Sequence, residues 1–211
     1  MNRRHLLALL LVLAISLATS PFAPPAGAQT EPPEAVAVTA ALEGQVFLLR
    51  AGRQIALEPG MAVAESDEVL TFPNGRVRLR FADGSLVTIG PNSRCLVAFR
   101  RHTAERTGQV LRLIEGILRV FTAEAAADRI EVRTRSAIST PRGTEWIVER
   151  LPGSTAVFVI EGAVAVRGAG DAGVLLGPGF GTDVPDGAPP GVPKRWGQAR
   201  VEDVLERTHL P

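Results

Sequence analysis

Short runs of alternating apolar and polar residues, separated by turn residues, dominate this chain from Asp67 onward. The turns recur about every eight to twelve residues, which is typical of folds built from short strands. In one such run, Val77, Leu79 and Phe81 fall on one face, and the arginines between them fall on the other. The sequence therefore predicts an all-β fold, either a twisted, antiparallel-rich β-sandwich or a β-solenoid-like roll of short strands.

Two dipeptides predict the tightest turns of this fold. Asn74-Gly75 and Asp83-Gly84 each lie between alternating runs, and both accept the positive φ values of a type I′ hairpin turn. Residues 90–93 are predicted to turn the chain again, so that residues 94–99 continue the same meander.

A third turn is predicted at residues 140–143. Pro141 pre-sets φ at the second position of a type I turn, and Gly143 suits the fourth. A strand is expected to begin at Thr144. Farther along, residues 155–160 are apolar on both faces, which favours a strand near the middle of the sheet.

An acid followed by a glycine precedes an alternating strand at three places in the chain. The spacing between these places is irregular, so a repeat protein of fixed period is not predicted. We interpret them as equivalent corners that recur as the sheet winds round. The three pairs are Glu43-Gly44, Glu115-Gly116 and Glu161-Gly162.

The first 28 residues predict a signal peptide. Arg3 and Arg4 precede an apolar stretch of thirteen residues at 6–18, and Ala26-Gly27-Ala28 supplies a small-x-small cleavage pattern. The apolar stretch is shorter than the roughly 18 residues that a spanning helix needs. We therefore expect cleavage near Ala28, with general secretion favoured over the twin-arginine route, and a periplasmic or secreted protein without an integral membrane segment.

Three parts are predicted after this cleavage. Residues 29–35 form a flexible N-terminal tail, and residues 36–184 form the β domain. Residues 185–211 form a Pro/Gly-rich linker and a short C-terminal helix. An apolar stripe of Val201, Val204 and Leu205 predicts that helix, and Trp196 is expected to pin its start to the β domain.

Charge and cysteine content exclude two classes of protein. Cleavage removes two arginines and no acids, which leaves 21 basic residues against 22 acidic ones. This balance argues against a nucleic-acid partner. Cys95 is the single cysteine, so an internal disulfide is excluded. Its strand-like surroundings predict a small, buried apolar side chain.

The sequence contains no motif of a known catalytic site. His102 and His209 lack the context of a catalytic triad, and there is no nucleophile elbow, His-x-x-x-His pair or cysteine pair. A cell-wall enzyme that uses Cys95 and His102 is the least favoured alternative, because the Ser-x-Gly-Cys type of signature is missing. We predict a protein that is not an enzyme and has no cofactor and no metal site.

Two groups of side chains are candidates for binding. Arg76, Arg78 and Arg80 stand about 7 Å apart on one strand face, where they could meet lipid phosphates, anionic wall polymers or an acidic partner. The alternative is a solvated face, or one paired with acids across the strand. Arg142 and Glu145 form the second candidate, as an anion- or partner-binding pair. Their structural alternative is to hydrogen-bond the turn and each other.

An ordered series of motifs between Leu42 and Arg167 resembles the FecR domain. Its most specific pieces are Arg-Gly-Thr-Glu-Trp at 142–146 and Glu-Gly-x-Val at 161–164, preceded by Asp-Gly-Ser at 83–85. The resemblance implies an all-β periplasmic module of the cell envelope. The residues that shape its motifs would be Asp83, Gly84, Gly143, Thr144, Trp146, Glu161 and Gly162.

The best-known members of that family are regulators of iron uptake in Gram-negative envelopes. The resemblance implies the following domain order for those members: a cytoplasmic anti-sigma segment, one membrane helix, a periplasmic FecR domain, and a further module that meets the signalling domain of a TonB-dependent receptor. This sequence departs from that plan, because a signal peptide stands where the cytoplasmic segment would be and few residues follow Arg167. The resemblance implies an exported, stand-alone binding or regulatory module for a protein or an anionic envelope polymer. An envelope structural or adhesion protein is the alternative.

Overall fold

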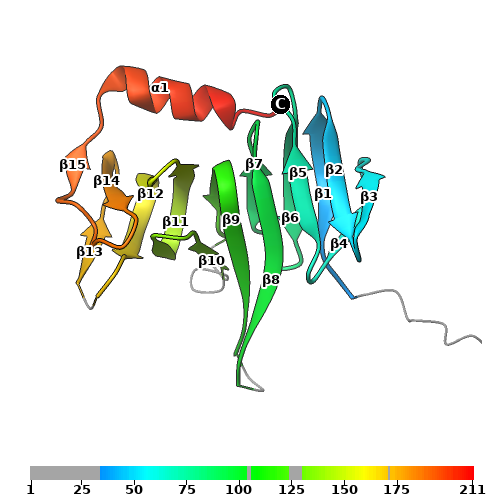
Figure 1. Cartoon of the computed structure of the whole chain (residues 1–211), viewed down its shortest axis with the longest axis horizontal. Coiled ribbons are helices and arrows are strands. Elements are labelled where there is room, and N and C mark those ends of the chain that lie inside the picture. Colours follow the sequence, from blue (N-terminus) through cyan, green and yellow to red (C-terminus); the bar gives the residue numbers. More distant parts are fainter. Residues whose placement is uncertain (1–33, 104–105, 124–129, 171) are drawn as a thin grey trace, which may run out of the picture. The chain divides into compact units, whose positions relative to one another are not determined.

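The computed structural model describes residues 34–103, 106–123, 130–170 and 172–211 (Figure 1). The predicted signal peptide and most of the predicted tail lie outside these residues. Residues 33–211 belong to one compact unit. Among the described residues, no helix has the length and apolar character required to span a membrane.

Strand pairing arranges this unit in two rows that share three long strands. Nearly all neighbours are antiparallel, and β9 and β10 form the parallel pair. The first row contains, in order, β3 (Arg53–Ala56), β2 (Val46–Arg50), β5 (Glu68–Thr71), β8 (Arg94–Thr103), the start of β9 (Arg106–Phe121), β10 (Ile130–Arg133), the start of β11 (Ile138–Leu151), the end of β12 (Ser154–Arg167) and β13 (Gly173–Leu176).

The second row uses the remaining halves of the three long strands. It contains, in order, β4 (Ala62–Ala64), β1 (Ala35–Glu43), β6 (Arg76–Phe81), β7 (Leu86–Ile89), the end of β9, the end of β11, the start of β12, β14 (Phe180–Pro185) and β15 (Lys194–Arg195). One apolar core contains buried residues of both rows, such as Leu48 and Val164 from the first and Leu79 and Trp146 from the second. The prediction of an all-β, antiparallel-rich fold is thus confirmed.

Glycines mark the points where the chain passes between the rows. Gly116 in β9, Gly143 in β11 and Gly162 in β12 have φ values of +88°, +60° and +78°, and Gly44 between β1 and β2 has +66°. A Cβ on Gly44 or Gly162 would lie 2.0 or 2.1 Å from a backbone oxygen of a neighbouring corner. Only glycine fits there without a shift of the backbone. The interpretation of the three Glu-Gly pairs as equivalent corners is confirmed.

The hairpin predicted at Asn74-Gly75 is wrong. The strands on either side, β5 and β6, do not pair with each other but lie in different rows. Gly75 donates its N–H to the oxygen of Phe72 at 2.8 Å, and a Cβ on Gly75 would lie 2.2 Å from the oxygen of Gln45. Glycine is required there for close approach of two corners. The turn at 90–93 is likewise a corner and not part of a meander, because β8 pairs with β5 and β9 rather than with β7.

The hairpin predicted at Asp83-Gly84 is confirmed, but its turn type differs. β6 and β7 pair on either side of it, and Gly84 donates to the oxygen of Phe81 at 3.0 Å. Gly84 has φ +85°, whereas Asp83 has no positive φ. This is the three-residue hairpin loop in which a type I turn ends in a left-handed glycine.

The type I turn predicted at residues 140–143 is also wrong, because these residues lie within β11. Thr140 and Pro141 continue the ladder opposite Ala165 and Val164, and the register shifts after Arg142. The left-handed Gly143 therefore bends the strand from one row to the other without reversing it.

The predicted C-terminal helix is present as α1 (Gln198–Arg207), which runs across the strands of the second row (Figure 1). It covers a second apolar cluster that includes Ile117, Ile147 and Val204. Trp196, just before the helix, stacks on Phe158 with ring centroids 4.8 Å apart. The expectation that Trp196 pins the helix to the β domain is confirmed.

Candidate anion-binding site

A groove of about 710 Å³ lies beside the turn between β10 and β11. Strands β9 to β12 and the loop after β14 supply its walls. We call it the arginine groove, because its charged lining residues are five arginines: Arg112, Arg133, Arg135, Arg150 and Arg167.

Strand register aligns three of these arginines across the outer face of the first row. Arg112 of β9 lies opposite Arg133 of β10, Arg133 opposite Ile138 of β11, and Ile138 opposite Arg167 of β12. Neighbouring strands are about 4.8 Å apart, so Arg112 and Arg133 are roughly 5 Å apart at the backbone, and Arg167 lies roughly 10 Å beyond Arg133. Three guanidinium groups thus cover one level of the sheet.

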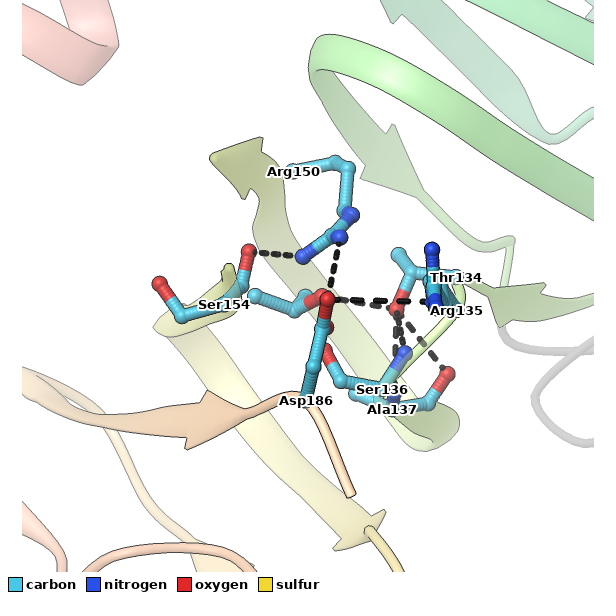
Figure 2. A network of polar contacts seen from close by, with 8 residues as sticks. Thr134, Arg135, Ser136, Ala137, Arg150, Ser154 and Asp186 are labelled. Carbon is cyan, nitrogen blue, oxygen red and sulfur yellow. Dashed lines mark hydrogen bonds and ion pairs between the residues drawn. The ribbon is translucent and has the colours of Figure 1, made fainter. Parts of the chain in front are cut away.

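Two carboxylates neutralise part of this charge. Asp186 accepts from Arg150 at 2.9 Å and lies 3.8 Å from Arg135 (Figure 2). Glu131 accepts from the Nε of Arg133.

The other two arginines, Arg112 and Arg167, are exposed and have no acidic partner among the described residues. Counting only the residues that the structure describes, five guanidinium groups thus face two carboxylates, an excess of three positive charges.

A buried hydroxyl network fixes the turn that carries Arg135. The Oγ1 atom of Thr155 lies 2.7 Å from both Thr134 Oγ1 and Ser136 Oγ, and Ala137 donates its N–H to Thr134 Oγ1 at 2.9 Å (Figure 2). Arg150 also donates to the oxygen of Ser154 at 2.6 Å. The groove therefore has an ordered wall before any ligand arrives, which reduces the entropy lost on binding.

The lining favours a carboxylate or phosphate over a ring-shaped neutral ligand. Guanidinium groups present planar forks that match both anions. No aromatic side chain lines the groove, so it offers no stacking platform for bases or sugar rings. Ile114 is exposed within it and Ile138 is half-buried, so aliphatic parts of a ligand would also find contacts.

The predicted arginine stripe lies on β6, on the outer face of the second row. Arg76 donates to the oxygen of Arg207 at 3.1 Å, Arg78 donates to the oxygen of Leu210, and Arg80 is exposed. Arg76 also lies 3.6 Å from Glu43. Two members of the stripe thus hold the segment at the end of α1. A binding role for the stripe stays a prediction.

The second predicted pair is divided in the structure. Glu145 forms an ion pair with Arg119 of β9 at 2.7 Å, while the side chain of Arg142 lies outside the described part of the chain. The neighbouring Thr144 is buried and donates its hydroxyl to the oxygen of Ala163 at 2.7 Å, which ties β11 to β12. A binding role for Arg142 and Glu145 also stays a prediction.

The remaining motif residues occupy structural positions. Asp83 accepts from the N–H of Ser85 at 2.9 Å within the hairpin loop. Trp146 is fully buried in the core, and Glu161 stands exposed before the corner at Gly162. These positions agree with a role in shaping the fold.

Cys95 is a poor nucleophile in this fold. It is fully buried in β8, and burial raises the pKa of its thiol to about 12. The side chain of His102 lies outside the described residues. The cell-wall-enzyme alternative therefore has no available thiolate. Within the described ranges, no group of three His, Cys, Asp or Glu residues is arranged to hold a metal ion.

The arginine groove is not evident from the sequence. Arg112, Arg133 and Arg167 lie on different strands, and only the pairing register brings them to one level. The nearest sequence signal is the pair of alternating arginines at 133 and 135, which by itself resembles any half-exposed strand end.

Comparison with known proteins agrees with the resemblance found in the sequence. Residues 67–165 match the family model described as FecR protein. No curated protein matches the chain.

Two solved structures of a candidate anti-sigma factor from Parabacteroides distasonis ATCC 8503 share the fold. Their TM-scores are 0.51 and 0.53, at 19% and 18% sequence identity. The alignments cover 65% of this chain and 64% and 63% of the other chains, so this chain spans less than two thirds of their length. At this identity the likeness concerns the fold alone.

Proposed function

We propose that this chain, whose residues 67–165 are of the FecR type, is a non-catalytic binding module that holds an anionic group of its partner in the arginine groove. The excess of three positive charges over an ordered wall carries the proposal. FecR proteins and anti-sigma factors are regulatory kinds of protein, so we assign the module to regulation or signalling.

The proposed place of action is the periplasm or the exterior of the cell. This rests on the signal peptide predicted at residues 1–28. The proposed partner is then a protein or an anionic polymer of the envelope.

A pair of charge reversals tests the proposal. The protein would be titrated against fluorescein-labelled poly-L-glutamate at low salt, with fluorescence anisotropy as the readout. We expect Arg112→Glu combined with Arg167→Glu to weaken binding at least tenfold, because neither arginine has an acidic partner in the described part of the chain. Binding by the unchanged protein should also weaken as salt is added.

Arg53→Glu provides the control. It reverses one exposed arginine on β3, at the edge of the first row and outside the groove. Loss of binding in this variant as large as in the double variant would mean that overall charge, not the groove, drives binding. Unchanged binding by the double variant would contradict the proposal outright. Thermal unfolding of all variants would check that each one is folded, since surface substitutions usually change stability by less than about 0.5 kcal/mol.

A further inference from the structure

On the side that faces the groove, a short stretch of β9 has no strand partner among the described residues. On this side of β9, pairing with β10 ends at Arg112, opposite Arg133, and pairing with β11 begins at Gly116, opposite Arg150. Between these points, Leu113 and Glu115 pair with β8 on the other side, the register shifts at Ile114, and no described residue pairs with 113–115 on the groove side. Leu113 and Ile114 line the arginine groove. An unpaired strand segment offers backbone N–H and C=O groups to another chain.

The charges around this stretch select the kind of chain that can pair with it. Arg112 immediately precedes the stretch, and Arg133 lies at the end of β10, where an added strand would continue. Arg150 lies on the opposite wall and already pairs with Asp186. Side chains at alternate positions of an added strand would share one face with Arg112 and Ile114. A segment with alternating acidic and aliphatic residues therefore complements both the charges and the exposed isoleucine.

We propose that the partner presents an acidic, extended polypeptide segment, which adds a short strand to residues 113–115 and places its carboxylates against Arg112 and Arg167. This rests on the function proposed above and names the partner class for the same groove. The groove of about 710 Å³ lies within the range of roughly 300–1,000 Å³ typical of ligand sites, enough for a short stretch of peptide. An acidic polysaccharide could form ion pairs with the arginines, but it could not pair with residues 113–115 as an added strand.

Three labelled peptides test this inference by fluorescence anisotropy. The first alternates acid and valine, acetyl-(Glu-Val)3-amide. The second has the same side chains with N-methylated backbone amides, and the third replaces each glutamate with lysine. We expect the first peptide to bind at least tenfold more tightly than the second, because methylation removes the N–H donors and blocks approach of the strand. The lysine peptide should show no binding.

Amide hydrogen exchange locates the contact. We expect the acidic peptide to slow exchange at residues 113–115 at least tenfold in the unchanged protein and in Arg53→Glu. No such slowing is expected in the Arg112→Glu and Arg167→Glu double variant.

The outcomes separate this inference from the function it rests on. Equal binding of the N-methylated and unmodified peptides, with loss in the double variant, would overturn strand addition and leave the anion site standing. Binding of polygalacturonate, but not peptide, through Arg112 and Arg167 would do the same in favour of an acidic polymer. No dependence of any probe on these arginines would overturn both proposals.

Discussion

Replacing Gly162 with alanine should destabilise the protein far more than the same change at Gly153, although both glycines have φ +78°. A Cβ on Gly153 would meet no atom within 4 Å, whereas a Cβ on Gly162 would lie 2.1 Å from the oxygen of Gly143 and 2.9 Å from the hydroxyl of Thr144. The two variants therefore share the backbone strain, and only one adds a collision between corners.

The magnitudes follow from these two contributions. Alanine in the left-handed region costs about 1–2 kcal/mol, which is the full cost expected at Gly153. Forcing extra volume into a packed site adds about 1–3 kcal/mol. The oxygen of Gly143 cannot retreat easily, because Thr144 next to it is hydrogen-bonded to Ala163 of β12. We expect a total cost of about 2–5 kcal/mol for Gly162→Ala.

Urea unfolding followed by tryptophan fluorescence measures this difference. The chain has two tryptophans, Trp146 and Trp196, and both are buried, so unfolding exposes both indole rings. The two variants should unfold with the same denaturant slope as the unchanged protein but at different midpoints. Equal losses of free energy in the two variants would refute the idea that stacked corners, and not φ alone, require glycine at Gly162.

Two further predictions concern titratable groups. Cys95 should resist a thiol reagent at pH 8 in the native protein and react once urea unfolds it, because its thiol is buried and its pKa is raised to about 12; rapid native labelling would contradict the placement of β8. The Arg200 guanidinium, with help from Lys194, lowers the pKa of Asp183, so this carboxylate stabilises the fold above its ordinary pKa of 3.8, and that contribution is lost as the pH falls through the lower folded value. Asp183→Asn should therefore cost at most about 1 kcal/mol near pH 7, since the pair is partly exposed. The stability of this variant and of the unchanged protein should converge as the pH falls through the lowered pKa of Asp183.

The sequence predicted which face of a strand is buried better than it predicted how consecutive strands are connected. Alternation identifies the buried face of β6 because side chains on a strand have a period of two. Asn-Gly and Asp-Gly, in contrast, indicate only that the backbone can adopt positive φ values at these positions. At Asp83-Gly84 that freedom forms a hairpin, whereas at Asn74-Gly75 it lets two corners approach closely. Which of the two occurs depends on strand partners that lie far away in the sequence.

The binding residues were harder to predict for a related reason. An alternating run of arginines shows that one strand face is not core, but it does not show whether another element covers that face. On β6, Arg76 donates to the oxygen of Arg207 at the end of α1, and Arg78 donates to the oxygen of Leu210 beyond the helix. Arginine donors commonly satisfy the free carbonyls at a helix C-terminus.

The two outer faces of the sandwich therefore use the same residue type in different ways. On the second row, Arg76 and Arg78 donate to backbone oxygens of Arg207 and Leu210, at the C-terminal end of their own chain. On the first row, Arg112, Arg133 and Arg167 come from three strands, and α1 packs elsewhere, against the second row. Charge satisfied within the fold contributes to stability, whereas charge left open at an unpaired strand edge is available to a partner. Because of this difference in covering elements, and not because of the number of arginines, we propose the binding site on the first row.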